Sequence, residues 1–186
     1  MGRYLKKSVI IIIMFILFIG GEIMEAGAQP PLLYNSVERN TVYQNTAEKA
    51  IATAKSLKSY LRAGRVWISH APRGEIEVKG AVLYQNAVVM VIHFDPATGE
   101  VLPRGYHPFL STTQIPLEKI QKKLEEIIPY LEVLNGAEYR EPELCWAIPV
   151  SYKGKIVGHI KIYYDGIRVV PDFKAQEEMQ YYLNYR

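Results

Sequence analysis

Two side chains that could take part in chemistry stand two residues apart near the middle of the chain. His93 and Asp95 fall on one face of an expected strand, because side chains alternate along β-structure. An imidazole beside a carboxylate can begin a metal site or hold a histidine in one orientation. No third ligand stands at a recognisable spacing, and the other histidines lie outside any H-E-x-x-H helix. The sequence therefore predicts a polar patch at a strand end, with no metal, no cofactor and no catalytic residues.

Cys145 is the one cysteine of the chain, so a disulfide within the chain is excluded. It stands beside Trp146 in an expected strand, where a lone cysteine is usually a small buried apolar residue rather than a nucleophile. The sequence contains no G-x-S-x-G elbow, P-loop or dinucleotide-binding fingerprint. These observations favour a protein that is not an enzyme.

Two groups of residues are candidate binding surfaces. The first lies on one side of an expected helix and consists of Lys55, Lys58 and Arg62. It would bind an anionic polymer or lipid headgroups, or else form the solvated back of the helix. The second lies near the C-terminal end and consists of Tyr181, Tyr182 and Tyr185. These tyrosines would bind a partner or fold back over a sheet, and both interpretations stay open.

The elements that would position these residues begin with a helix from Asn45 that is ended by Gly64. Three short strands follow, at residues 65–69, 75–84 and 88–94. Residues 95–99 then predict a structural turn. In this turn Asp95 can hydrogen-bond its own backbone, Pro96 has a preset φ, and Gly99 can adopt a positive φ.

A second series of elements starts at Pro116 with a helix that Pro129 should kink or divide and that should end at residues 135–136. Strands are expected at residues 144–152 and 155–164, followed by a turn at Asp165 and Gly166. Asp172 is placed to cap a short C-terminal helix. This order predicts the α+β class, with helices packed on antiparallel β-meanders.

The stretch from Ala81 to Pro103 recurs in degraded form from Ile148 to Pro171. We therefore expect one unit, a helix packed on a short antiparallel meander, to occur twice. Each unit is too small to close a good core alone, so the two should form one cooperative body with matched helices on matched sheets. The expected organisation is a signal peptide (1–28), an N-terminal tether (29–44), unit 1 (45–108) and unit 2 with a C-terminal helix (109–186).

The first residues have the pattern of a secretory signal peptide. Basic residues precede an apolar run at residues 9–19, and Ala26-Gly27-Ala28 offers a cleavage point. The alternative is an uncleaved anchor, which would then be the chain's contact with a membrane. In both cases we expect the remainder to be extracytoplasmic, either secreted or anchored facing outward. The net charge of +3 is too small to indicate a nucleic-acid binder, which would need concentrated basic charge.

Unit 1 resembles a PepSY domain in its alanine-rich helix, AEKAIATA, its meander, and the closing D-x-x-T-G-E-V-L pattern at residues 95–102. In unit 2 the turn at Asp165 and Gly166 is shorter and the Thr-Gly-Glu portion is missing. PepSY domains are small exported modules found in propeptides of thermolysin-like metallopeptidases and in envelope proteins. The resemblance implies a role in binding and in restraining a peptidase.

Three functions remain open from the sequence. The first is an extracytoplasmic binding or inhibitory module that receives an extended peptide in a groove or at a strand edge. The second is a structural accessory of a cell-envelope complex, held by an uncleaved N-terminal anchor. In both, the partner is a protein or peptide of the envelope. The third is a secreted hydrolase that uses His93, Asp95 or His107.

Overall fold

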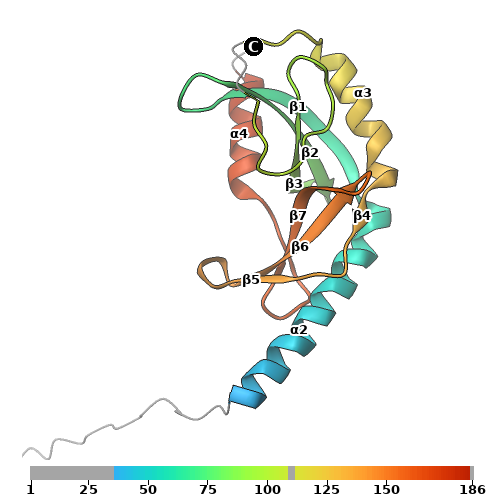
Figure 1. Ribbon diagram of the computed structural model, residues 1–186, viewed down its shortest axis with the longest axis vertical. Helices are drawn as coiled ribbons and strands as arrows, with labels where there is room; N and C mark the ends of the chain where they lie inside the picture. Colours follow the sequence, from blue (N-terminus) through green and yellow to red (C-terminus); the bar gives the residue numbers. More distant parts are fainter. Residues whose placement is uncertain (1–35, 109–111, 185–186) are drawn as a thin grey trace, which may run out of the picture. The chain divides into compact units, whose positions relative to one another are not determined.

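The computed structural model describes residues 36–108 and 112–184 (Figure 1). The expected signal peptide at residues 1–28, the first part of the expected tether and Tyr185 lie outside the described residues. The described residues from 37 onward belong to one compact unit. Among the helices of the described part, none is both long enough and apolar enough to cross a membrane.

The described residues form helices and two antiparallel sheets, which confirms the α+β class. The first half of the fold contains α2 (Ser36–Leu57), the 3-10 helix η1 (Lys58–Tyr60), β1 (Arg62–His70), β2 (Ile76–Tyr84) and β3 (Ala87–Phe94). The second half contains α3 (Leu117–Ile127), η2 (Ile128–Tyr130), β4 (Glu132–Val133), β5 (Glu138–Arg140), η3 (Glu141–Glu143), β6 (Cys145–Tyr152), β7 (Lys155–Tyr163), β8 (Val169–Val170) and α4 (Phe173–Asn184). The first sheet has the order β1-β2-β3; the second has the order β4-β6-β7-β8, with β5 also paired to β6.

Helix α2 differs at both ends from the expected helix. It begins at Ser36 rather than Asn45, so residues 36–44, which were expected to lie in the tether, are helical. Asn45 is exposed inside the helix, where its side chain can point to solvent instead of capping, and no Gly or Pro interrupts the segment. Gly64 does not end the helix but lies in β1, where an added Cβ would come 2.8 Å from the Cβ of Ala81. Its small size is therefore needed for close contact between strands.

The helix α3 stops before Pro129, as proline in the sequence predicts, because η2 takes over at Ile128. The expected continuation to residues 135–136 is wrong, since Glu132 and Val133 pair with β6 as strand β4. Helices α2 and α3 end alike, because a 3-10 helix follows each of them. Leu61 N–H donates to Lys58 O after α2 (3.3 Å), and Leu131 N–H donates to Ile128 O after α3 (3.2 Å).

The central hairpins of the two sheets also share their irregularities. Gln85 and Asn86 link β2 to β3 with φ of 49° and 67°, and Lys153 and Gly154 link β6 to β7 with φ of 50° and 75°. Two-residue turns with both central residues at positive φ match the twist of a hairpin. The ladder shifts register between Val82 and Leu83 in one sheet and between Val150 and Ser151 in the other. In each case the shift lies close to the turn.

The turns after β3 and β7 have the hydrogen bonds that the sequence predicts. Asp95 Oδ1 accepts from the backbone N–H groups of Ala97 (2.8 Å) and Thr98 (3.0 Å). Asp165 Oδ1 accepts from those of Ile167 (2.8 Å) and Arg168 (3.2 Å). Gly99 and Gly166 both adopt φ of 73°, which L side chains rarely take. The two aspartates and the two glycines therefore have a structural role in these turns.

One hydrophobic core contains buried side chains of both halves. Its buried members include Val78, Val82, Ile92, Ile120, Leu124, Ile148, Ile160 and Ile162. Strand β3 packs against β7, and Met90 fills the space beside Gly158 so closely that an added Cβ there would overlap Met90 Sδ. The two sheets therefore share one interior.

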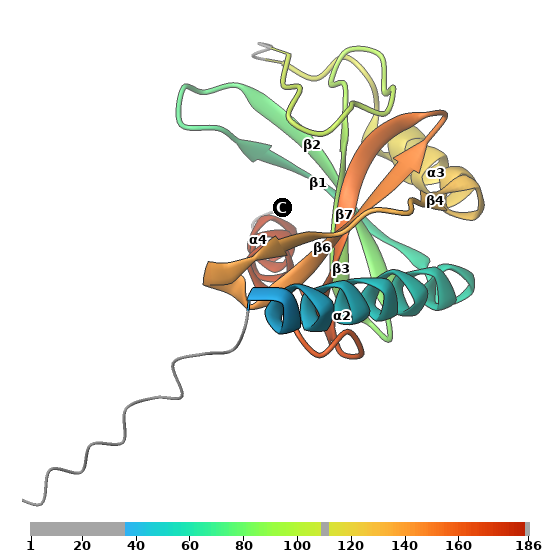
Figure 2. The same ribbon diagram turned by 60° about the horizontal axis from the view of Figure 1, so that its bottom comes forward.

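Helices α2 and α3 each reach across to the other half, which differs from the expectation of matched helices on matched sheets. Leu124 of α3 packs on Gly80 of β2, and Gln121 of α3 hydrogen-bonds the backbone of β1. Thr53 of α2 donates to Gly166 O between β7 and β8 (2.7 Å). Figure 2 shows α2 running past β6, and Figure 1 shows α3 beside β1 of the first sheet. The sequence showed that each helix buries a face but could not show against which sheet.

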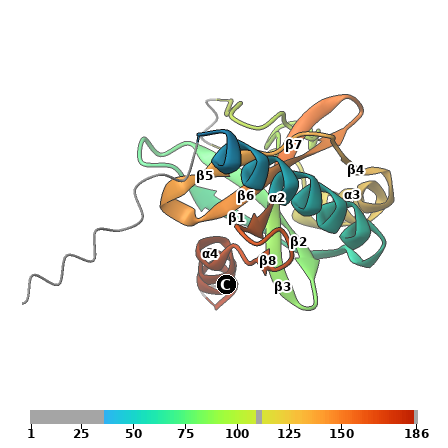
Figure 3. The same ribbon diagram turned by 90° about the horizontal axis from the view of Figure 1, so that it is seen from below.

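The C-terminal helix α4 covers the remaining face of the first sheet. Ala175 packs with the buried residues Trp67, Ala81 and Val88, which form a cluster separate from the main core. Helices α3 and α4 thus lie on opposite sides of β1–β3 (Figure 3). As predicted, Asp172 caps α4, with Oδ1 accepting from Ala175 N–H at 3.1 Å.

Candidate functional site

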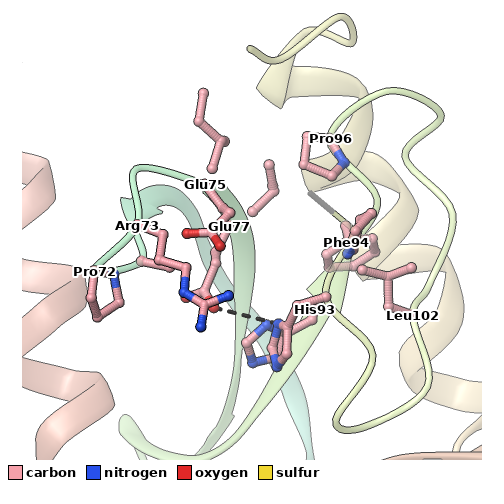
Figure 4. A pocket seen from close by; sticks show the side chains of 13 residues that line it. Pro72, Arg73, Glu75, Glu77, His93, Phe94, Pro96 and Leu102 are labelled. Carbon is pink, nitrogen blue, oxygen red and sulfur yellow. Dashed lines mark ion pairs between the residues drawn. The ribbon is translucent and has the colours of Figure 1, made fainter. Parts of the chain in front are cut away.

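A pocket of about 450 Å³ opens where the β1–β2 loop, the start of β2, the end of β3 and the connector after β3 meet (Figure 4). Apolar side chains such as Ile76, Phe94 and Leu102 form much of its wall. Its polar lining residues are Arg73, Glu75, Glu77, His93 and His107. Both the size and the mixture of an apolar wall with a few polar groups are typical of ligand-binding pockets.

Strand pairing places the polar groups of the site on the face of the first sheet that α4 covers. Ser69 is paired with Glu77, and Lys79 is paired with His93. Residues opposite each other in an antiparallel ladder share a face, and so do residues two apart. The connector then brings His107 over Glu77, with His107 Nδ1 3.4 Å from Glu77 Oε1, the contact dashed in Figure 4.

The two histidines and the glutamate form a compact cluster. The rings of His93 and His107 meet edge to face, with their centroids 5.1 Å apart. One possible ligand atom from each of Glu77, His93 and His107 lies within 4.8 Å of the other two. The three side chains come from β2, β3 and the connector, so the cluster depends on the folded arrangement of all three.

A charged network holds the cluster from the α4 side. Lys79 Nζ lies 2.8 Å from Glu77 Oε2 and 2.7 Å from Glu178 Oε1 on α4. Burial would lower the pKa of Lys79, but its bonds to Glu178 and Glu77 outweigh burial and raise that pKa. Burial would likewise raise the pKa of Glu77, but Lys79, helped by the two histidines, holds it below its ordinary value. Both groups are therefore charged at neutral pH.

His93 is neutral at physiological pH. Burial, together with the positive charge of Lys79, lowers the pKa of His93 to about 4. A neutral imidazole keeps a lone pair on one ring nitrogen and a proton on the other. His93 can therefore act as a ligand or as a hydrogen-bonding group without first losing a proton.

The expected pair of His93 and Asp95 is not brought together as one site, because the Asp95 carboxylate is engaged in its own turn. The structure gives His93 two other companions, Glu77 and His107. The alternation of Glu77 with Ile76 and Val78 along the expected strand 75–84 is a sequence signal for an outward face, but it does not indicate which residue lies opposite. His107 was named as a possible hydrolase residue, but no sequence pattern placed it beside Glu77 and His93, because its position depends on the path of an irregular connector.

The candidate basic surface is only partly assembled. Lys55 and Lys58 are exposed near the end of α2, but Arg62 belongs to β1 and not to the helix. Lys55 Nζ donates to Asn135 Oδ1, so this cation has a partner within the protein. The basic residues therefore do not form the single helical stripe that the sequence suggested.

The tyrosines near the C-terminal end divide between the two interpretations. Tyr181 is 56% exposed, whereas Tyr182 packs beside the cluster between α4 and the first sheet. Their rings meet edge to face at 5.1 Å. Tyr182 thus helps to cover the sheet, and the exposed face of Tyr181 is left as a surface.

Cys145 is buried, as expected for a small apolar residue in a strand. Burial raises the pKa of its thiol, and the nearby Glu143 carboxylate acts in the same direction. The thiolate is the nucleophilic form of cysteine. Cys145 is therefore held in its unreactive form at neutral pH.

Side chains of helices α3 and α4 form hydrogen bonds with backbone groups along the edges of the first sheet. On β1, Gln121 accepts from Val66 N–H (3.1 Å) and donates to Gly64 O (2.9 Å). On β3, Gln176 accepts from Val88 N–H (3.0 Å), and Leu102 N–H donates to His93 O (2.8 Å). A peptide adding as a further strand would have to displace these bonds.

Comparisons of the chain with protein-family models, with curated proteins and with solved structures found no match.

Proposed function

We propose that this chain is an exported, non-catalytic binding module made of two PepSY-like units, and that its pocket beside His93 receives a segment of a protein or peptide partner. The observation that carries the proposal is the pocket itself, which combines an apolar wall with a few polar and charged groups. An apolar side chain of the partner would enter the pocket, while polar groups of its backbone would meet Arg73, Glu75 and the histidines.

The recurrence of local features supports the repeated units. Each half has a helix that ends in a 3-10 turn, a hairpin whose two turn residues have positive φ, and a register shift near that hairpin. Each then continues into a turn organised by an aspartate. The resemblance of the first unit to PepSY domains adds the restraint of a peptidase as one role for such binding.

The pocket is a better place for a partner than the edges of the first sheet. The bonds of Gln121 and Gln176 already satisfy edge groups of β1 and β3. Addition of a strand gains stability from free backbone groups, so occupied edges reduce that gain. We therefore favour insertion into the pocket over β-strand addition.

The contacts at the site favour binding over hydrolysis by a serine or cysteine nucleophile. Ser69 Oγ donates to Glu77 Oε2 (3.3 Å) rather than to an imidazole, and Ser69 is only 2% exposed. Activation of a serine requires a general base within hydrogen-bonding reach. The buried thiol of Cys145 is also in its neutral form.

Selection from a random peptide library displayed on phage tests the proposed pocket. Ala71 lines the pocket, so Ala71→Trp should fill it and weaken binding of the selected peptides at least about tenfold. Ala52→Trp, on the exposed side of α2, is the matched control and should bind normally. Failure to enrich any peptide, or an equal loss in both variants, would contradict the proposal.

The exported state has its own test. We propose cleavage after Ala28, so mass spectrometry of the native protein should find Gln29 as its first residue. An intact Met1 in a membrane fraction would instead favour the alternative of an anchored accessory of an envelope complex.

A further inference from the structure

We propose that Glu77, His93 and His107 form a binding site for one divalent transition-metal ion of the Zn²⁺ type. The inference goes beyond the binding of a partner and does not depend on it. It rests on three donor groups of the right chemistry that separate segments of the chain bring together.

The spacing of the donors suits a small cation. Zn²⁺ bonds to imidazole nitrogen and carboxylate oxygen at about 2.0–2.2 Å, so tetrahedral donors stand about 3.3 Å apart. His107 Nδ1 and Glu77 Oε1 are 3.4 Å apart, and all three donors lie within 4.8 Å of one another. His107 is 48% exposed on the connector, so it can close the remaining gap without moving the sheet.

The Glu77 carboxylate is already oriented as a metal ligand would be. Its Oε2 receives Lys79 Nζ (2.8 Å) and the Ser69 hydroxyl (3.3 Å), while Oε1 faces His107. Hydrogen bonds to one oxygen of a ligating carboxylate fix the direction of the other. Glu178 binds Lys79 from α4 and offsets its positive charge, so the lysine positions Glu77 at a smaller cost in repulsion.

The donor set selects a class of metal. Two imidazoles and one carboxylate suit Zn²⁺ and neighbouring ions such as Co²⁺ and Ni²⁺, whereas Ca²⁺ and Mg²⁺ prefer oxygen donors. Three protein ligands leave one tetrahedral position for water, as in zinc sites that are not purely structural. All three ligands line the pocket, so this position would be reached from the pocket.

Metal titration of the full chain, purified without a histidine tag and stripped with a chelator, tests the site. Calorimetry with Zn²⁺ should show one saturable site per chain, and Co²⁺ should give the visible absorption of an ion with nitrogen and oxygen ligands. His107→Ala and Glu77→Gln should each weaken binding at least about tenfold while the circular dichroism spectrum stays unchanged. The control is His70→Ala, because His70 is exposed on the same sheet but outside the cluster.

Three results would overturn the proposal. They are the absence of saturable binding by the native chain, unchanged affinity in His107→Ala, and a loss in His70→Ala as large as that in His107→Ala. Glu77→Gln keeps the size and hydrogen-bonding shape of the side chain, so it tests the charge of the ligand even where His107→Ala disturbs the connector.

Discussion

The first and second sheets have similar backbones but different chemistry. Counted back from the two-residue turns, the pair Lys79 and His93 of the first sheet corresponds to Ala147 and Lys161 of the second. His93 faces a pocket and a charged network, whereas Lys161 binds Glu143 in a surface ion pair. A hairpin with the same turn and the same register shift therefore does not determine a site. The site is determined by the residues that the connector after β3 and helix α4 bring to the hairpin.

The two halves also differ in the helices that cover their sheets. Helix α3 packs on the first sheet and α2 contacts the second half, while α4 covers only the first sheet. The first sheet is thereby enclosed on both faces, and this enclosure leaves His93 and Lys79 partly buried. The following experiments test or sharpen this contrast, in order of decreasing expected effect.

Separating the halves should have the largest effect. A fragment of residues 29–108 lacks α3 and α4, and a fragment of residues 109–186 lacks α2, so each loses a helix that covers its sheet. Each fragment should be largely unfolded by circular dichroism and hydrogen exchange, and mixing the two should restore the folded spectrum. The full chain should melt in one transition. Two fragments that fold independently would contradict the exchange of helices.

Crowding the contact between β3 and β7 should have the next largest effect. In Gly158→Val the added side chain overlaps Met90 Sδ inside the core, so the free energy of unfolding should fall by about 3 kcal/mol in urea denaturation. Adding Met90→Ala should make the double variant less destabilised than the sum of the single changes. As a control, Lys155→Val at the exposed start of β7 should change stability by less than about 0.5 kcal/mol.

Acid should destabilise the metal-free protein through His93. The pKa of His93 in the folded protein is about 4, below the ordinary histidine value of 6.5, so the unfolded chain binds the proton first as the pH falls. The contribution of neutral His93 to the free energy of unfolding is fully present above pH 6.5. It is lost as the pH falls from about 6.5 to 4, and the total loss is limited to roughly 3 kcal/mol.

His93→Gln should remove that part of the pH dependence, measured by denaturation at several pH values in the presence of a chelator. His70→Gln, at an exposed position, should leave the dependence as it is. A parallel loss of stability for the native chain and His93→Gln across this range would show that another group is responsible.

The close approach of α2 to the turn after β7 can be measured by comparing two glycines. Gly166 and Gly154 both have positive φ, of 73° and 75°, so Ala should cost about 1 kcal/mol at either position from backbone strain. A Cβ on Gly166 would also lie 2.8 Å from Thr46 O, whereas one on Gly154 meets nothing within 4 Å. Gly166→Ala should therefore lose at least about 1 kcal/mol more in urea denaturation. Equal losses would mean that α2 does not hold this turn.

Local patterns in the sequence predicted most of the elements but not their partners. The Asp95 and Asp165 turns, the stop at Pro129 and the cap at Asp172 depend on neighbours in the chain, so they could be recognised directly. The start of α2 could not, because capping residues such as Asn45 are also tolerated inside a helix. Its contact with the second half depends on packing between distant segments.

The candidate site likewise combines a residue that the sequence indicated with partners that it did not. His93 attracted attention as a histidine near a carboxylate, but its partner is Glu77 on the neighbouring strand and not Asp95. Identifying Glu77 requires the register of β2 against β3, and identifying His107 requires the path of the connector. Neither is encoded as a fixed spacing along the chain.

The hydrogen bond between Thr53 of α2 and Gly166 joins residues 113 positions apart. A chain that emerges from the ribosome, or from a translocation channel, N-terminus first therefore completes α2 long before the turn that holds it has appeared. The apolar side of α2 must stay uncovered during this interval, when it is open to aggregation and to binding by chaperones. Folding must also wait for a distant contact, which slows it compared with a fold built from neighbouring segments. Because α2 packs on the second half, the first third of the chain can reach its native position only after the last third has been made.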